Sequence, residues 1–550
     1  MTALRYIFPC LLAIGAVVPA SHVNAATLHV GAASCDITPD MPSFLAGQFS
    51  PRVSQGVEYP LAANVLALES RDGDKPLDSA IVISVDTGAV RASILLPIRA
   101  AVQQQLPGFD LGKLIVAATH THSAPPSKDG HFKQQEGVQV PSDYVKFAAA
   151  RIGAAAQQAW NGRRPARFSY GLGHAVVAYN RRAVYADGTA VMYGPTNAPN
   201  FRAIEGMEDH DVNTMFFWDT SDKLLAIVVN VSCPSQEVEN NRLLSSDYWG
   251  PTREMLQEKY GRDVTIVGLC GAAGDQSPHL RYRQAADDRM RSLRKLDRLQ
   301  EIARRIVHGV SEAYEVVQTA KQDDVVVKHQ QAVLHLPQRI VTEAEYQSCK
   351  AEAERLKASP GDGRGNWNAR VVARYEKLAA DPHPTHATPI NVLRIGDTVI
   401  CTNPFELYTD FGVQMKARSK AVQTFVVQLA NGAAAPPPPA DAPEDETNDW
   451  LYASSGTYLP SFRAGPEGRR IRRRHSKQCG RSRRRADARG RNGEDGQRHV
   501  VTGDLSDYLE WLTNTHTRRW CVKSRQMRPA PVFAPVFARR WPESSSPHTH

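Results

Sequence analysis

The chain has 550 residues, of which 42% are hydrophobic and 22% charged, a composition that excludes a disordered or fibrous protein. It contains no run of 18 apolar residues, so we expect no transmembrane segment. The net charge of +9 is concentrated at one end, because residues 463–499 carry a net +10 and residues 500–550 a net +3, which leaves −4 for residues 1–462. The main body is therefore mildly acidic and has no excess of positive charge that would attract an anionic ligand. Nucleic acid is not expected as a partner.

The first 25 residues have the pattern of a secretory signal peptide. Arg5 precedes an apolar stretch from Tyr6 to Pro19, and the segment ends in Val23-Asn24-Ala25. This pattern predicts cleavage after Ala25 and a secreted or periplasmic mature protein, the alternative being a buried N-terminal helix.

The main body alternates between strand patterns and helix patterns, which predicts an α/β protein with a mixed β-sheet core. Short β-branched runs typical of buried strands occupy 27–33, 79–85, 114–118, 224–231 and 264–269. Helical patterns occupy 93–105, 142–160 and 248–259. Two charged stretches, 283–317 and 343–358, are predicted to be helices that cover the core.

The C-terminal part differs in kind from the rest. Residues 433–449 form an Ala/Pro run followed by acidic residues, which predicts a flexible insertion. Residues 463–550 begin with an Arg-rich tail that we predict to be irregular or disordered. Residues 469–500 can be encoded by codons whose next reading frame specifies a Gly-rich turn followed by an amphipathic helix. Our hypothesis is therefore a frame slip near codon 468. The alternative is a true cationic arm for anionic polymers.

Cysteine usage excludes a disulfide scaffold. Outside the signal peptide and the tail there are five scattered cysteines, Cys35, Cys233, Cys270, Cys349 and Cys401. An odd number in an exported protein leaves at least one thiol free or bound to a metal.

Two histidines follow the predicted strand 114–118. His120 and His122 stand two residues apart before a loop rich in Ser and Pro, and period-2 alternation predicts that both imidazoles lie on one face. Two such histidines make a common half-site for a metal. For His120 the alternative is a hydrogen-bonded structural role.

Three further strand ends carry polar side chains. Cys233 follows the strand 224–231 and is either a thiolate ligand or a small buried hydrophobe. The loop 271–279 after the next strand combines glycines with Asp275, Ser277 and His279 and lacks the elbow motif of α/β-hydrolases. The strand 399–402 leads to Glu406. Loops that offer His, Cys, Ser and Glu at strand ends are typical of a zinc hydrolase assembled from separate segments.

The order of these blocks resembles the N-terminal catalytic domain of the neutral/alkaline ceramidase family. The blocks are VGAASCDITP, IVAATHTHSAPP, AYNRR, VNVSCPSQ, SSDYWG, LCGAAGDQSPH, CTNPFE and VVQLANG. They span about residues 28–462, so we expect one catalytic domain over residues 26–462. The resemblance implies a secreted zinc amidase that cleaves the N-acyl bond of ceramide to a fatty acid and sphingosine.

The same resemblance implies a set of metal ligands. By position, His120 and Glu406 match zinc ligands of the family, and Cys233 stands where the family has its second histidine ligand, so that a thiolate would replace an imidazole there. The family's late tyrosine ligand corresponds to Tyr458 or, as the alternative, Tyr452.

The resemblance also implies roles in catalysis. His122 faces the substrate, and Ser277 matches the family's active-site serine, which acts as nucleophile or holds the substrate head. Arg181 matches a substrate-contacting arginine, and Asp275, in the same loop as Ser277, is expected to take part in catalysis. We expect Zn²⁺ as the cofactor and a lipid-like N-acyl amide, met at a membrane surface, as the substrate. The alternatives are an amidase of the same fold that acts on another N-acyl compound, and a non-catalytic secreted binding protein with a cationic tail.

Overall fold

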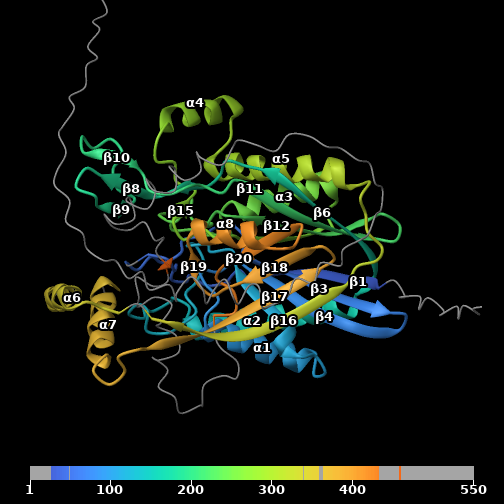
Figure 1. Ribbon diagram of the computed structural model, residues 1–550, viewed down its shortest axis with the longest axis horizontal. Coiled ribbons are helices and arrows are strands. Elements are labelled where there is room, and N and C mark those ends of the chain that lie inside the picture. Colours follow the sequence, from blue (N-terminus) through green and yellow to red (C-terminus); the bar gives the residue numbers. More distant parts are fainter. Residues whose placement is uncertain (1–25, 49, 339, 358–362, 433–457, 460–550) are drawn as a thin grey trace, which may run out of the picture.

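Two β-sheets contain most of the buried strands of the protein. The computed structural model describes residues 26–48, 50–338, 340–357, 363–432 and 458–459 (Figure 1). The larger sheet has eight strands in the order β14 (Thr265–Cys270), β12 (Leu224–Val231), β11 (Asp211–Asp219), β6 (Arg164–His174), β1 (Thr27–Asp36), β3 (Ala62–Asp72), β4 (Lys75–Val85) and β5 (Leu114–Ala118). β12/β14 and β4/β5 are parallel pairs and the other pairs are antiparallel, so the predicted mixed sheet is confirmed.

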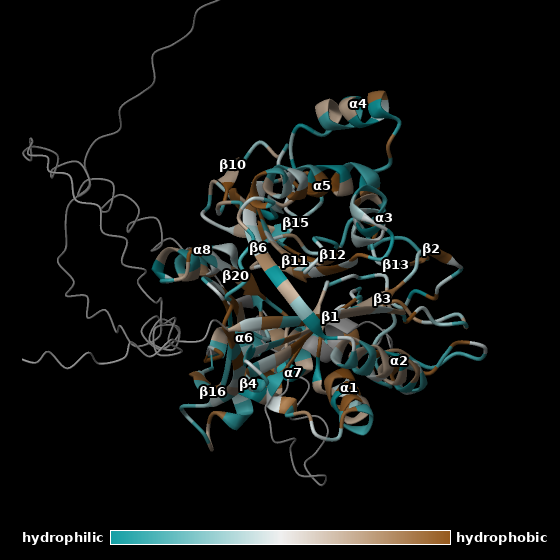
Figure 2. Cartoon of the chain, turned by 90° about the vertical axis from the view of Figure 1, so that its right-hand side faces the viewer, coloured by the Kyte–Doolittle hydropathy of each residue, from teal (hydrophilic) through white to brown (hydrophobic). Residues whose placement is uncertain are grey.

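The two halves of the larger sheet face each other across a shared apolar core. Helices α3 (Trp249–Tyr260) and α5 (Arg298–Val317) cover the outer face of the β14-to-β6 half, and α1 (Ala92–Gln105) and α2 (Pro141–Asn161) cover the outer face of the β1-to-β5 half (Figure 1). The inner faces of both halves contribute to one cluster, in which Val82 of β4 and Val228 of β12 are both buried. Hydrophobic residues are accordingly concentrated in the strands of the interior (Figure 2).

The second sheet has four strands and packs into the same core. Its order is β16 (Val327–Pro337), β17 (Thr385–Ile395), β18 (Thr398–Thr402) and β20 (Gln423–Val427). Leu393 and Phe425 enter the shared cluster, while the outer face packs against α8 (Thr409–Arg418). The chain after β20 joins both halves of the larger sheet, because Gln428 N donates to Cys270 O at 3.1 Å and Asn431 N donates to Val116 O at 3.0 Å.

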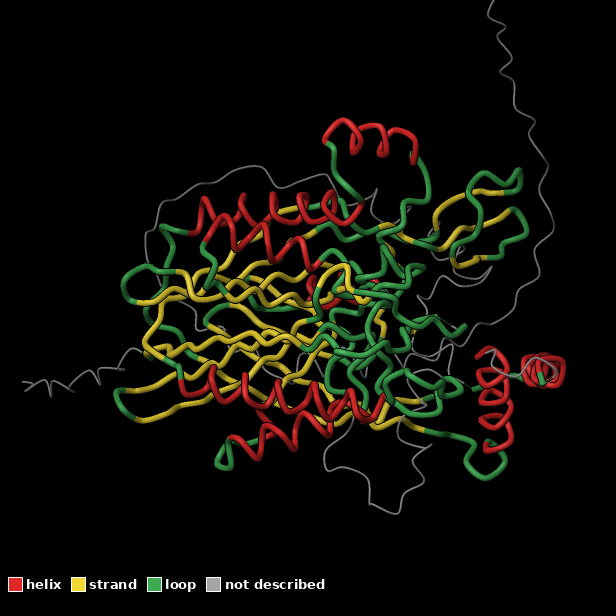
Figure 3. Tube along the Cα trace, turned by 180° about the vertical axis from the view of Figure 1, so that it is seen from behind, coloured by secondary structure: helices red, strands yellow, loops and turns green. Residues whose placement is uncertain are grey.

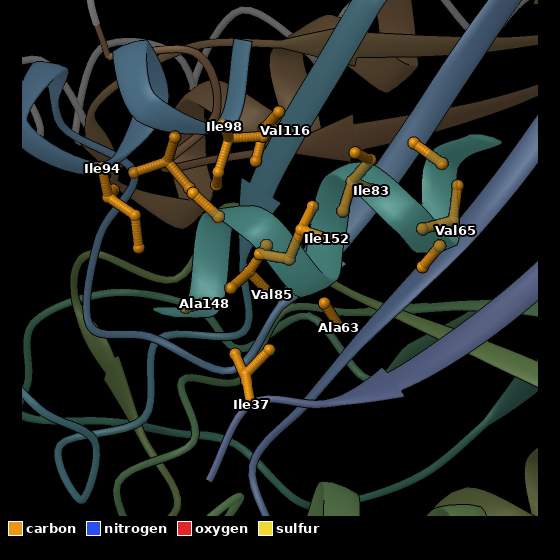
Figure 4. Packing of buried hydrophobic residues seen from close by; sticks show 14 of the residues in the cluster. Ile37, Ala63, Val65, Ile83, Val85, Ile94, Ile98, Val116, Ala148 and Ile152 are labelled. Carbon is orange, nitrogen blue, oxygen red and sulfur yellow. The ribbon is translucent and has the colours of Figure 1, made fainter. Parts of the chain in front are cut away.

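The packing of α1 and α2 shows why the strands in this half of the sheet are apolar on both faces. Val65, Ile83 and Val116 project from neighbouring strands toward Ile98 of α1 and Ile152 of α2 (Figure 4). The residues between them on each strand point to the opposite, inner face. Since both faces of these strands are buried, the strands appear in the sequence as nearly continuous apolar runs.

One three-stranded sheet and three two-stranded pairs complete the described β-structure. They are β10–β8–β9 (Phe201–Ile204, Arg182–Tyr185, Ala190–Met192), β13–β2 (Leu244–Ser245, Val57–Tyr59), β15–β7 (Gln276–Ser277, Tyr179–Asn180) and β19–β21 (Glu406–Leu407, Tyr458–Leu459). A short 3-10 turn, Leu111–Lys113, precedes β5. Within the described part of the chain, no helix has the length and hydropathy needed to cross a membrane.

The two charged helical stretches differ from their prediction. The stretch 283–317 is not one helix but two, α4 (Gln284–Arg294) and α5, since Lys295 adopts a left-handed conformation and Asp297 begins α5 with a capping box. α5 covers the core as predicted, whereas α6 (Glu343–Leu356) packs against α7 (Gly363–Lys377) in a separate small cluster that projects from the body (Figure 1).

Several predictions fall on residues outside those that the structure describes. These are the signal peptide 1–25, the insertion 433–449, the tail 463–550 and the alternative ligand Tyr452. Among the described residues the five cysteines are all free thiols, in agreement with the absence of a disulfide scaffold.

Candidate active site

The predicted site residues follow strands whose ends meet on one side of the sheets, where loops gather (Figure 3). Ser235, after β12, donates its hydroxyl to the carbonyl of Thr119, after β5, at 2.7 Å. Gln428, after β20, accepts from the backbone N–H of Ala273 at 3.1 Å and from that of Leu407 at 2.9 Å through its side-chain oxygen. One buried amide thus fixes the loop after β14 against the segment that carries Glu406.

His120 and Glu406 face each other in the interior of this loop cluster. His120 Nε2 lies 3.6 Å from Glu406 Oε1, and the two residues are 2% and 6% exposed. The other ring nitrogen, Nδ1, contacts the carbonyl oxygen of Gly88. Since a carbonyl only accepts, Nδ1 carries a proton, and Nε2 is the ring nitrogen that faces Glu406.

The strand pattern did not predict how the two histidines come together. β5 ends at Ala118, and His120 has a positive φ of 69°, so the alternation of the strand does not continue through it. A non-glycine residue in this region is strained, and such strain is concentrated at functional sites. The imidazoles of His120 and His122 nevertheless lie side by side, edge to face, with ring centroids 5.0 Å apart.

Arg181 connects Glu406 to the serine loop. Its Nη2 lies 3.7 Å from Glu406 Oε2 and donates to Gly274 O at 2.9 Å, and its Nη1 donates to the hydroxyl of Tyr193 at 2.9 Å. That hydroxyl in turn donates to Ser277 Oγ at 3.4 Å. Burial raises the pKa of the Glu406 carboxyl, but the neighbouring His120 and Arg181 outweigh burial and lower the pKa to about 2, so the carboxylate is ionised.

His122 is held by a carboxylate and an amide. Its Nδ1 lies 2.7 Å from Glu239 Oε2, and its Nε2 lies 2.9 Å from the amide nitrogen of Gln236. Because a carboxylate accepts and an amide NH₂ donates, Nδ1 carries the proton and Nε2 is an acceptor. Burial and the adjacent His120 lower the pKa of His122, although Glu239 acts to raise it, so the imidazole is neutral near pH 7.

Asp275 has a supporting place in the structure. Its Oδ1 accepts from the backbone N–H and the hydroxyl of Thr409 at 2.9 and 2.8 Å, and its Oδ2 accepts from the amide of Asn180 at 2.9 Å. Its backbone oxygen accepts from Arg181 N at 2.8 Å. The carboxylate therefore positions the segments that carry Arg181 and Glu406, whereas the sequence suggested a direct part in catalysis.

Cys233 is not brought to His120 and Glu406. It continues the alternation of β12, in which Val229 and Val231 face α3 and α5, and its side chain enters the same apolar cluster. The thiol donates to Val177 O at 3.4 Å, and burial raises the pKa of the thiol well above its ordinary value. Of the two alternatives that the sequence left open for Cys233, the structure favours the small buried hydrophobe over the thiolate ligand.

The backbone of Tyr458 lies next to the backbone of Glu406 in a short β-pair. Its two-residue strand β21 pairs in parallel with β19, and the register sets Tyr458 opposite Glu406. Some fifty residues of sequence separate these positions, so the backbone alone brings the predicted late tyrosine to the predicted carboxylate.

The donor atoms present fit a zinc ion. The 3.6 Å between His120 Nε2 and Glu406 Oε1 exceeds hydrogen-bond length but is close to the roughly 3.4 Å that separates two ligands about 2.1 Å from one tetrahedral zinc. A neutral ring nitrogen and an ionised carboxylate are ligands that zinc prefers. Among the described residues no group of three or more His, Cys, Asp or Glu side chains that could hold a metal ion is found.

Three site residues escaped the sequence analysis as functional groups: Gln236, Glu239 and Tyr193. His279, which the sequence placed in the polar loop 271–279, has its Nδ1 3.7 Å from Glu239 Oε1, so two imidazoles flank one carboxylate. Gln236 lies in the loop after the predicted strand 224–231, and this position near a strand end was the available signal. Tyr193 lies between short strands and carried no such signal.

The fold is similar to that of solved neutral ceramidase structures. The structure matches the crystal structure of neutral ceramidase from Pseudomonas aeruginosa with a TM-score of 0.54 and 18% identity, over 74% of this chain and 68% of that chain. A ceramidase structure described as complexed with C2 matches with a TM-score of 0.52 and 16% identity over the same shares. This likeness confirms the fold that the sequence motifs suggested. A scan of family models and a search of curated proteins give no match to the sequence.

Proposed function

We propose that this chain is an exported, zinc-dependent amidohydrolase that cleaves the N-acyl amide bond of ceramide or a ceramide-like lipid, giving a fatty acid and a sphingoid base. The observation that carries the proposal is the facing pair of His120 Nε2 and ionised Glu406, 3.6 Å apart and beside Arg181. The fold shared with a neutral ceramidase supports it.

The metal would be held by His120, Glu406 and Tyr458. Three protein ligands are the usual number for a catalytic zinc site, which keeps one position open. Zinc, when bound, acts as a Lewis acid that activates water and polarises the substrate carbonyl. Cys233 is not part of this ligand set, since its thiol faces the apolar cluster under α3.

His122 supplies the proton transfer that amide cleavage needs. With Nδ1–H bound to Glu239, the unprotonated Nε2 exchanges its hydrogen bond from Gln236 for a proton from the attacking water, and it returns this proton to the nitrogen of the leaving amine. Glu239 also stabilises the imidazolium that exists between these two transfers. The hydrogen bond from Gln236 holds the ring in place before the substrate arrives.

Arg181 and Ser277 hold polar groups of the substrate. The guanidinium is 4% exposed and already bonded to Gly274 O and Tyr193, so its position is fixed before binding. Fixed donors cost no reorganisation when charge develops on the substrate oxygen. Ser277, linked to Arg181 through the hydroxyl of Tyr193, offers a second donor on the same side.

Turnover of a fluorogenic N-acyl sphingosine tests the proposal. The purified full chain is assayed as isolated, after treatment with a zinc chelator, and after zinc is restored, with the fatty acid and amine identified by mass spectrometry. We expect activity that the chelator abolishes and zinc restores, and a loss of at least about 100-fold in His122→Gln. Hydrolysis that survives the chelator would refute the zinc dependence. If the protein hydrolyses other N-acyl amides but not the N-acyl sphingosine, its substrate is a different class of N-acyl compound. If it hydrolyses none of them and is retained on heparin in a salt-sensitive way, the non-catalytic binding protein is favoured.

A further inference from the structure

Helix α4 exposes an apolar stripe to solvent, which surface helices normally bury. Its residues, all of them described, are exposed or half-exposed. Ala286, Met290 and Leu293 follow one another at i, i+4 and i+7 and so share one face, and Met290 and Leu293 are 42% and 63% exposed. Tyr282, just before the helix, is 42% exposed.

The polar face of α4 is the face attached to the protein. Asp287 accepts from Arg298 Nη1 and from Arg305 Nη2 of α5, both at 2.7 Å. Arg294 lies 3.4 Å from the buried carboxylate of Glu301. Ion pairs thus hold the helix by its polar face above α5 (Figure 1), and the apolar stripe stays exposed.

Positive charge surrounds the stripe on a body that is otherwise acidic. Residues 281–295 contain six Lys and Arg and two Asp, a net +4, whereas residues 1–462 as a whole carry −4. Both aspartates are already engaged, Asp287 with α5 and Asp288 with Arg291 at 3.2 Å. On a helical wheel Arg289 borders the stripe on one side and Arg294 on the other, which is the arrangement of helices that lie in the surface of an anionic membrane.

We infer that α4 docks the protein on an anionic lipid surface, with Met290 and Leu293 in the headgroup region and Arg289 against lipid phosphates. The segment Pro278–Arg283 connects this helix directly to Ser277, and Arg281 ties it to the carbonyls of Tyr193 and Gly194 at 2.7 and 2.8 Å. The helix therefore couples a lipid surface to the loop that carries the candidate active-site serine. Docking itself does not require the proposed hydrolysis.

A local optical probe tests the inference and distinguishes a contact made by α4 from any attraction of anionic vesicles to the charge of the Arg-rich tail. Met290→Trp is made in the full chain, and Val422→Trp, at a 68% exposed apolar position in the loop between α8 and β20, is the matched control. Both proteins are titrated with phosphatidylglycerol/phosphatidylcholine vesicles whose acyl chains carry bromine. We expect a blue shift and quenching of the introduced indole in Met290→Trp and neither in Val422→Trp.

Second substitutions define the contacts. Leu293→Ser in the Met290→Trp background is expected to weaken binding at least about 5-fold, since one large apolar side chain is no longer buried. Arg289→Gln is expected to weaken binding to anionic vesicles and to leave binding to neutral ones unchanged. Equal signals at both tryptophan positions, or an unchanged affinity in Leu293→Ser, would overturn the inference. A sedimentation coefficient that rises with protein concentration and no longer does so in Leu293→Ser would also overturn it, by assigning the stripe to a second copy of the chain.

Discussion

Replacing Gly47 with alanine is expected to disable the candidate active site and to leave the rest of the fold in place. A Cβ at Gly47 would lie 2.2 Å from Cγ of His122, whereas ordinary contact begins at 3.4 Å. The imidazole must therefore retreat by about 1.2 Å, the difference between these distances. Its bonds to Glu239 and Gln236, now 2.7 and 2.9 Å long, would be stretched beyond hydrogen-bond range.

The size of the effect follows from this displacement. Misplacing a catalytic group by about 1 Å costs roughly 100-fold in rate, so kcat/KM for the fluorogenic N-acyl sphingosine should fall by about that factor. Alanine also pays for the positive φ of 88° at Gly47, at about 1–2 kcal/mol of unfolding free energy. That backbone cost must be separated from the loss of the imidazole.

Gly73→Ala is the matched control for the backbone cost. Gly73 also has a positive φ, 58°, but a Cβ there meets nothing within 4 Å. Gly73→Ala should lose the backbone cost alone and keep its activity, whereas Gly47→Ala should lose at least as much free energy of unfolding in urea together with its activity. If Gly47→Ala folds and retains more than a third of the wild-type kcat/KM, the assignment of proton transfer to His122 is refuted.

Three further predictions concern the metal and the stability of the core. His120→Ala should lose bound zinc and at least about 100-fold in activity, while Cys233→Ala should keep both; zinc measured by mass spectrometry decides, and metal loss in the cysteine variant would contradict our ligand set. Burial, with a smaller contribution from a nearby lysine, lowers the pKa of His329 from 6.5 to about 4, so between these pH values the unfolded chain binds a proton that the folded chain does not. The free energy of unfolding should therefore fall as the pH drops from 6.5 toward 4, by about 2–3 kcal/mol more than in His329→Gln, and equal slopes in urea titrations would contradict this. Arg253→Ala should cost about 3–5 kcal/mol, because it leaves Asp86, which is fully buried and bonded to Arg253 at 2.6 and 2.9 Å, without its cation. A loss below about 1 kcal/mol would show that solvent reaches the carboxylate.

Much of the fold could be predicted because the hydrophobic pattern of each strand indicates which of its faces are buried. β12 and β14 are buried along their entire length, and their β-branched runs indicate this directly. Helix boundaries were harder to predict. The break between α4 and α5 depends on a left-handed conformation at Lys295. Glycine is the residue that usually indicates this conformation, so a lysine does not predict it.

The site could be predicted only to the level of which loops contribute to it. Strand ends drew attention to His120 and Glu406, but their 3.6 Å separation depends on segments from opposite parts of the chain. The buried position of Cys233 could have been predicted from Val229 and Val231. The alternation of the strand continues into the loop, so the thiol faces the same apolar cluster as these two valines. Glu239 could not be assigned from sequence, since a carboxylate in a loop is usually solvated and only its contact with His122 distinguishes it.

The central claim, that His120 and Glu406 share one zinc ion, is tested most directly by a crystal of the zinc-loaded protein measured with X-rays on either side of the zinc absorption edge. Our account predicts one strong anomalous peak between His120 Nε2 and Glu406 Oε1, with both atoms about 2.1 Å from its centre. A peak at the sulfur of Cys233, or no peak between the two side chains in crystals that contain zinc elsewhere, would contradict it.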